Sequence, residues 1–179
     1  MDAVLFNNAF ASQQIGLKKN AEALYYKVVT QHSRSPLVPD ALLAMGEMAY
    51  DEKKFDAALE YFTQIEKFPN ARVYSYGMYK GAWTLYNQRK NDDAINKLIQ
   101  VVKYHDPSKQ DARKVNHNLR SESLRDLAIF FGEARKAEDA YAFFAKIATP
   151  DEVGEVMITM GKLFDSHSRH KEMTVFLND

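Results

Sequence analysis

The 179-residue sequence contains no cysteine, which excludes disulfides, thiol catalysis and thiolate metal sites. It also lacks any apolar run close to the roughly 18 residues that a membrane-spanning helix needs. Neither charge sign is in excess, with 24 basic and 24 acidic residues, so no global field favours nucleic acid or an anionic membrane. We therefore expect no direct membrane insertion by this segment and no nucleic-acid partner.

Sequence motifs of catalysis and metal binding are missing as well. There is no glycine-rich phosphate loop, no Gly-x-Ser-x-Gly nucleophile elbow and no His-Glu-x-x-His zinc motif. His167 and His170 are three residues apart and could share a helix face, but a surface pair beside a turn is the commoner arrangement. We predict no enzyme activity, no catalytic residue, no metal and no cofactor.

Proline separates the segments of the chain that have helical periodicity. The five prolines all fall at the joints between such segments, at positions 36, 39, 69, 107 and 150. The segments themselves are rich in Ala, Leu, Lys, Glu and Tyr, and they show neither alternating β-branched runs nor Asn-Gly or Asp-Gly hairpin turns. This pattern predicts an all-α protein.

An internal repeat is the strongest feature of the sequence. Gly46 is followed twelve residues later by Ala58, and then by the large residues Phe62 and Ile65. The same frame recurs with Ala9, Ala21, Tyr25 and Val28, with Ala82, Ala94, Leu98 and Val101, with Ala128, Ala140, Phe144 and Ile147, and with Gly161, Met173 and Leu177. Small residues let two antiparallel helices cross closely, and the large ones fill the groove to the next helix. The alternative is an ordinary helical bundle with coincidental alanines.

These spaced small and large residues resemble the tetratricopeptide repeat, a two-helix unit of about 34 residues. The resemblance implies a right-handed superhelical solenoid of antiparallel helix pairs with about five repeats. The predicted units span approximately 2–36, 39–69, 75–106, 121–150 and 154–179, in one domain with an insertion at 107–120. The stretch from Tyr25 to Ile65 is similar to bacterial cell-envelope members of the family, such as the Tol-Pal coordinator and the β-barrel assembly lipoprotein. That similarity favours the periplasm or cell envelope, with the cytoplasm as the alternative.

Aromatic residues are concentrated in the stretch YSYGMYKGAWTLYNQR, residues 74–89. At 100° per residue, one helix face holds Tyr74, Met78, Gly81, Ala82 and Leu85, and an adjacent stripe holds Tyr76, Tyr79, Trp83 and Tyr86. In the resembled family the first helix of each unit lines a concave groove, and this stripe occupies the groove positions. The neighbouring units place Leu43, Glu47, Tyr50, Arg125 and Ile129 at equivalent positions. We predict that these nine residues bind a partner; the alternative is that the aromatic rings seal against neighbouring repeats.

The predicted function is a non-enzymatic scaffold that binds a peptide or helical segment of another protein in an aromatic groove, in a bacterial envelope or motility assembly. The groove lacks the cations and amides that clamp a C-terminal carboxylate, because Leu43 and Glu47 stand at those positions. The alternative is a regulatory or anchoring repeat domain of a larger protein, with self-association through the terminal repeat compatible with either. Residues 104–121 lie in a net positive stretch that we interpret as a solvated connecting loop or helix extension. The alternative is that it contacts an acidic partner, a lipid headgroup or RNA.

Overall fold

The computed structural model describes residues 1–108, 116–169, 172 and 174. Within these residues the regular elements are nine α-helices and one short 3-10 helix, and none is a strand. The all-α fold class predicted from the sequence is confirmed. Contacts divide the chain into two compact units, Met1–Gln88 and Arg89–Asp179. The proposal of a single domain with five repeat boundaries stays a prediction.

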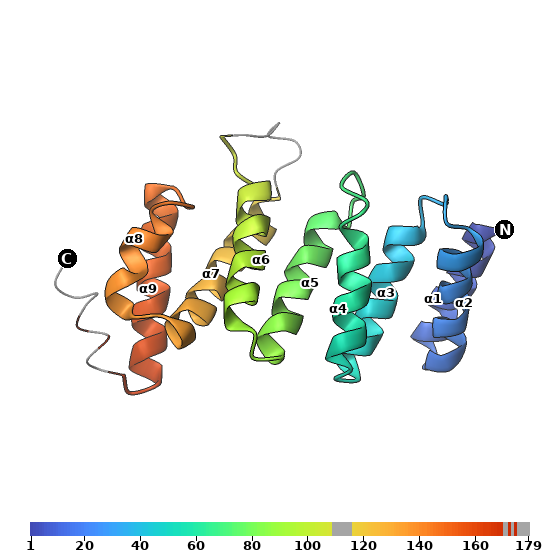
Figure 1. The fold of residues 1–179 in the computed structure, drawn as a ribbon, viewed down its shortest axis with the longest axis horizontal. Coiled ribbons are helices and arrows are strands. Elements are labelled where there is room, and N and C mark those ends of the chain that lie inside the picture. Colours follow the sequence, from blue (N-terminus) through green and yellow to red (C-terminus); the bar gives the residue numbers. More distant parts are fainter. Residues whose placement is uncertain (109–115, 170–171, 173, 175–179) are drawn as a thin grey trace. The chain divides into compact units, whose positions relative to one another are not determined.

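The first unit consists of two helix hairpins and one further helix (Figure 1). Its helices are α1 (Asp2–Gln14), α2 (Lys18–Gln31), α3 (Val38–Asp51), α4 (Phe55–Ile65) and α5 (Tyr74–Asn87). Helices α1 and α2 pack against each other, as do α3 and α4, and α5 packs against both α4 and α3. The core between these helices is formed by large side chains such as Tyr25, Phe62 and Ile65, each of which is almost completely buried.

The second unit begins with two long helices and ends with a third (Figure 1). Its elements are α6 (Asn91–Tyr104), α7 (His117–Ala134), the 3-10 helix η1 (Ala137–Asp139), α8 (Ala140–Phe144) and α9 (Pro150–Ser166). Helix α7 packs against α6 and α9, and α9 also packs against the short helix α8. Phe130, Phe131, Phe144 and Phe164 fill the core of this unit.

The small residues of the repeat lie where helices approach each other. Seven alanines of the repeat frame have no exposed surface: Ala9, Ala21, Ala58, Ala82, Ala94, Ala128 and Ala140. At Gly46 on α3, an added Cβ would lie 2.5 Å from Cε1 of Phe62 on α4, which is closer than real Cβ atoms come. The prediction that small side chains allow these close contacts is confirmed at Gly46 and the seven alanines, but not at Gly161, where nothing lies within 4 Å of an added Cβ. Met173 and Leu177, which complete the fifth unit, lie outside the described residues.

A left-handed residue ends the first helix of four predicted units. Each lies seven residues after the first small residue of its unit, and the four are Gly16, Lys53, Arg89 and Ser168, with φ of 79°, 59°, 63° and 55°. After Gly16, Lys53 and Ser168 the amide of the next residue bonds back into the helix, as Lys54 N does to Ala49 O at 2.9 Å. This is the Schellman type of helix end, which normally prefers glycine. The equivalent residue in the fourth unit, Arg135, is extended instead, with φ −129° and ψ 167°.

Two helices of the second unit start earlier than the repeat frame suggests. Helix α7 begins at His117 rather than near Ser121, because the Asn116 side chain accepts a hydrogen bond from Leu119 N at 3.0 Å and caps the helix. Helix α9 begins at Pro150, and Thr149 forms a capping box before it. The first residues of α7 therefore lie inside the range assigned to the insertion, and residues 109–115 of that range lie outside the described residues.

Candidate functional site

The residues predicted to bind a partner in the first unit lie on α3 and α5, which pack against each other. We call their surface the α3–α5 face; it comprises Leu43, Glu47, Tyr50, Tyr76, Tyr79, Lys80, Trp83 and Tyr86. The adjacent packing stripe of α5 is buried, with Met78, Ala82 and Leu85 in the core, whereas Tyr76 is 36% exposed and the other three aromatic residues are half-buried. Helix α5 thus separates a packing side from a side that retains aromatic surface.

Lys80 links the two helices of this face. Its Nζ lies 3.6 Å from Glu47 Oε1, 5.0 Å from the centre of the Tyr50 ring and 6.0 Å from the centre of the Tyr76 ring. The Tyr76 hydroxyl donates a long hydrogen bond, 3.5 Å, to the same Glu47 oxygen. A lysine near two aromatic rings gains about 0.5–1 kcal/mol per contact at exposed sites, and more when it is partly desolvated. The Lys80 side chain is 20% exposed, so the cation is largely held within the face.

Asn87 orders the end of the face. Its Nδ2 donates to the Tyr50 hydroxyl at 2.9 Å and to the carbonyl of Trp83 at 2.8 Å. Burial raises the pKa of the Tyr50 phenol, and the negative charge of Asp51 acts in the same direction, while the Asn87 hydrogen bond opposes them. The phenol is therefore protonated at neutral pH and can act as a donor.

The aromatic rings of α5 form two pairs. Tyr76 and Tyr79 stack with their centroids 6.0 Å apart and an interplanar angle of 22°. Trp83 and Tyr86 meet edge to face, at 5.5 Å and 85°. Ring pairs of this kind fix side-chain orientation, and each contributes about 0.5–1.5 kcal/mol beyond simple burial. The aromatic surface is consequently ordered before any ligand arrives.

The sequence prediction omits Lys80 of the α3–α5 face and Asn87 at its end, and it includes two residues from the other unit. The helical spacing of the aromatic positions on α5 indicates neither Lys80 nor Asn87. Arg125 and Ile129 lie on α7 in the second unit, where Arg125 is exposed and Ile129 is half-buried. Their part in partner binding stays a prediction.

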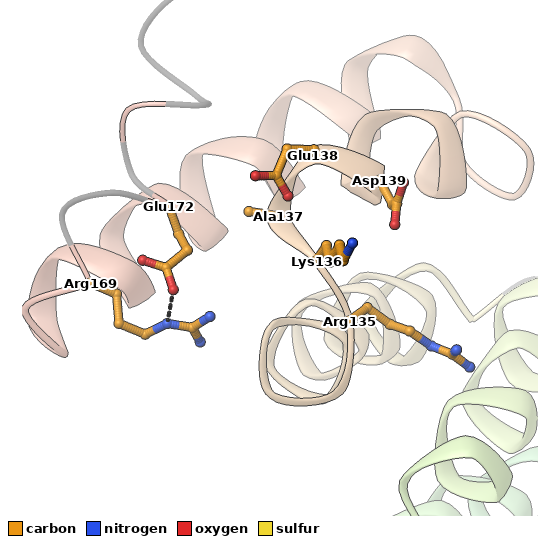
Figure 2. A pocket seen from close by; sticks show the side chains of 7 residues that line it. All are labelled: Arg135, Lys136, Ala137, Glu138, Asp139, Arg169 and Glu172. Carbon is orange, nitrogen blue, oxygen red and sulfur yellow. Dashed lines mark hydrogen bonds and ion pairs between the residues drawn. The ribbon is translucent and has the colours of Figure 1, made fainter.

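A charged hollow lies in the second unit, between the connection from α7 to α8 and the end of α9 (Figure 2). It is lined by Arg135, Lys136, Ala137, Glu138, Asp139, Arg169 and Glu172. Arg135 pairs with Asp92, and Figure 2 shows it pointing away from the pair formed by Arg169 and Glu172, whose Nε and Oε1 are 3.0 Å apart. Arg169 also donates to the carbonyl of Gly132 at 2.7 Å. Arg169 therefore ties the end of α9 to α7, whereas Arg135 and Asp92 form an exposed surface pair.

Arg120 is a buried cation that ties together three elements of the second unit. It is 3% exposed and forms a double ion pair with Glu152, with Nε to Oε1 at 2.6 Å and Nη2 to Oε2 at 2.8 Å. It also donates to the carbonyl of Val102 at 2.5 Å and to that of Ile147 at 3.3 Å. Burial favours the neutral form of Glu152, but hydrogen bonds from Arg120 and Thr149 outweigh it and lower its pKa. This cluster holds α6, α7 and α9 together rather than forming an open site.

Neither a cluster of metal ligands nor a membrane-spanning helix is present in the described part of the chain. Among residues 1–108 and 116–169, no three His, Asp or Glu side chains gather as metal ligands would. His167 is described, with Nδ1 2.8 Å from the carbonyl of Leu163, whereas its predicted companion His170 lies outside the described residues. The helices of the described part include none that is both long and apolar enough to cross a membrane.

The recurring hairpins, buried alanines and left-handed helix ends define an all-α protein built from repeated antiparallel helix pairs. Residues 13–72 match the family described as the tetratricopeptide repeat. Over 98% of its length the chain is similar to a crystal structure from Podosopora anserina. That structure is described as the nearly identical TPR-like repeats of a kinesin light chain. The TM-score is 0.63, the identity is 15%, and 90% of that chain is covered, so the likeness shows the fold. No curated protein matches the sequence.

Proposed function

We propose that the protein is a non-enzymatic interaction scaffold and that its α3–α5 face binds a peptide or helical segment of another protein. The proposal is supported mainly by the arrangement of the aromatic residues of α5. They stand on the side of the helix that does not enter the core, and neighbouring side chains hold them in ordered pairs. The match of residues 13–72 to a family of interaction repeats agrees with this proposal.

The chemistry of the face favours an apolar or aromatic ligand. Its two charged residues, Lys80 and Glu47, form an ion pair with each other, so a ligand meets a face that is neutral overall. Tyrosine and tryptophan offer large, stiff contact surfaces with a polar edge, and such residues dominate the energetics of protein interfaces. An amphipathic helix, or an extended segment with alternate apolar side chains, would bury these rings while its backbone or polar edge meets the hydroxyl groups.

A ligand that relies on a terminal carboxylate fits this face poorly. Such a ligand would have to compete with Glu47 for Lys80, at a nitrogen already 3.6 Å from a carboxylate oxygen. Leu43, one helical turn before Glu47, adds no hydrogen-bond donor. We infer that apolar side chains of the partner supply most of the binding free energy. Arg125 and Ile129 on α7 are proposed as additional contacts within the second unit, and a bacterial envelope or motility assembly is the proposed setting.

The experiment that tests this proposal begins with a peptide library displayed on phage and selected on the full chain. Affinity of the selected peptide is then measured by calorimetry for wild type and for the double variant Tyr79→Ala, Trp83→Ala. We expect the double variant to bind at least tenfold more weakly, because truncating central aromatic residues of an interface costs about 2 kcal/mol or more. Circular dichroism establishes that the variant is folded.

Tyr26→Ala is the matched control for that experiment. Tyr26 is 57% exposed and lies on α2 in the same unit, outside the α3–α5 face. Its loss removes exposed aromatic surface elsewhere in the unit, and we expect the affinity to stay within about twofold of wild type. Equal affinity of a folded double variant and wild type would overturn the assignment of this face. Equal losses in the double variant and in Tyr26→Ala would show that the peptide binds aromatic surface without specificity.

A further inference from the structure

His105 is a buried histidine that joins the end of α6 to the start of α7. It is the residue that follows α6, it is 3% exposed, and its Nδ1 accepts a hydrogen bond from the backbone N of Asn116 at 3.1 Å. A nitrogen that accepts cannot carry a proton, so the imidazole in this arrangement is neutral, with its hydrogen on Nε2. The bond connects residues eleven positions apart and closes the chain between the two helices.

The surroundings of His105 oppose a second positive charge. The guanidinium of Arg120 on α7 is buried nearby, and His117 lies at the beginning of the same helix. The Tyr104 ring covers the imidazole edge to face, with centroids 5.0 Å apart. Two acidic groups lie in this region: Glu152 of α9 is bound to Arg120, and Asp106 accepts hydrogen bonds from Ser108.

Protonation would therefore disturb His105 in two ways. The buried Nε2 has no hydrogen-bond partner among the described residues, so added charge on the ring would remain unsolvated. The proton on Nδ1 would also remove the acceptor for Asn116, the residue whose side chain caps α7. Burial chiefly, and then the charges of Arg120 and His117, lower the pKa of His105 below the ordinary histidine value.

We propose that His105 is a pH-sensitive latch: in its neutral form it holds the N-terminal cap of α7 against the end of α6, and its protonation releases that cap. The unfolded chain binds the proton more readily than the folded one. The stabilisation is therefore fully present above the ordinary histidine pKa of about 6.5, and it is lost as the pH falls from there toward the lower pKa of the folded protein. Glu152, the partner of Arg120, has a pKa below the ordinary carboxylate value of about 4.3, so its charge stays nearly constant between pH 7.5 and pH 5.5.

The latch is tested by urea unfolding of the full chain at pH 7.5 and at pH 5.5. His105→Asn is the informative variant, because its Oδ1 can occupy the place of Nδ1 and accept from Asn116 but cannot be protonated. We expect wild type to lose stability between these two pH values and His105→Asn to lose clearly less. His32→Asn is the control, since it removes a histidine that follows α2 in the first unit. It should keep the wild-type dependence on pH.

Nitrogen-15 NMR of the wild-type imidazoles provides a second readout, which does not depend on whether a variant folds. The expected signals for His105 are an Nε2–H tautomer and a titration midpoint below the ordinary histidine value of about 6.5. The proposal is overturned if His105 carries its proton on Nδ1, or if its titration midpoint is not below the ordinary histidine value of about 6.5. It is likewise overturned if a folded His105→Asn and wild type lose the same stability between the two pH values.

Discussion

Replacing Gly46 by alanine tests the close helix packing on which the fold depends. An ideal Cβ at this position of α3 would lie 2.5 Å from Cε1 and 2.8 Å from Cδ1 of Phe62 on α4. Carbon atoms in favourable contact are about 3.5–4 Å apart, so the ring would have to move by roughly 1 Å. Phe62 is 1% exposed and is surrounded by the core, which leaves little room for that movement.

Two opposing contributions set the expected change in the free energy of unfolding. Overpacking of a well-packed core costs about 1–3 kcal/mol. Alanine is favoured over glycine inside a helix by about 1 kcal/mol, which offsets part of that cost. Gly46→Ala should therefore lower the free energy of unfolding by as much as about 2 kcal/mol. Gly154→Ala on α9 is the control, because nothing lies within 4 Å of its added Cβ. It should raise the free energy of unfolding by up to about 1 kcal/mol.

Urea unfolding followed by circular dichroism measures the free energy of unfolding of both variants. The difference between the two values isolates the cost of the steric clash, about 1–3 kcal/mol. A double variant, Gly46→Ala with Phe62→Leu, removes the ring that the new methyl group would meet. It should be no less stable than Phe62→Leu alone. The packing argument is refuted if Gly46→Ala and Gly154→Ala stabilise the protein equally.

Four further predictions concern other parts of the structure. Lys53→Gly should raise the free energy of unfolding by up to about 1 kcal/mol in urea titrations, because glycine adopts the left-handed conformation without strain. Arg135→Gly should bring no such gain, since that residue is extended. Glu152→Gln leaves the buried charge of Arg120 uncompensated and should cost about 3 kcal/mol. Because the pKa of Glu152 is lowered in the folded protein, its contribution to the free energy of unfolding is present above the unfolded pKa of about 4.3. That contribution disappears as the pH falls through the folded pKa. In stability measurements across acid pH, Glu152→Gln should therefore lack this decline. Lys80→Gln should weaken binding of the selected peptide by up to about tenfold in calorimetry, because the rings of the α3–α5 face lose the cation between them.

The fold could be predicted from the sequence because its cause is local and repeated. A small residue recurs at the helix crossings of the first four predicted units, and the same spacing repeats from one unit to the next. Helix starts were predicted less well, because they depend on single caps rather than on a period. Asn116 and the Thr149–Glu152 capping box extend α7 and α9 toward the N-terminus by a few residues, and neither cap affects the apolar pattern.

The fourth unit shows why repeat frames do not fix every element. Ala140 and Phe144 occupy their predicted places in the core, yet the helix that carries them ends at Phe144. The extended conformation of Arg135 replaces the left-handed turn found at the equivalent position of other units, and a 3-10 turn follows it. A single backbone conformation of this kind is not encoded in the spacing of small and large residues.

Part of the candidate site could be predicted, because aromatic residues at helical spacing identify one face of α5. Lys80 was missed because its role depends on Tyr50 and Glu47, which another helix brings beside it. Arg120 was missed for a related reason. Its main partner, Glu152, lies 32 residues away, and the other two are backbone carbonyls, whose positions no side-chain pattern reveals.

Trp83 offers the most direct test of the central claim, because it is the single tryptophan of the chain and lies within the α3–α5 face. Its fluorescence can be followed while the peptide selected from the display library is titrated into the full chain. A ligand that binds this face should shift and change the intensity of the emission, and the change should saturate at the affinity measured by calorimetry. Binding detected by calorimetry without any change in Trp83 emission would contradict the account.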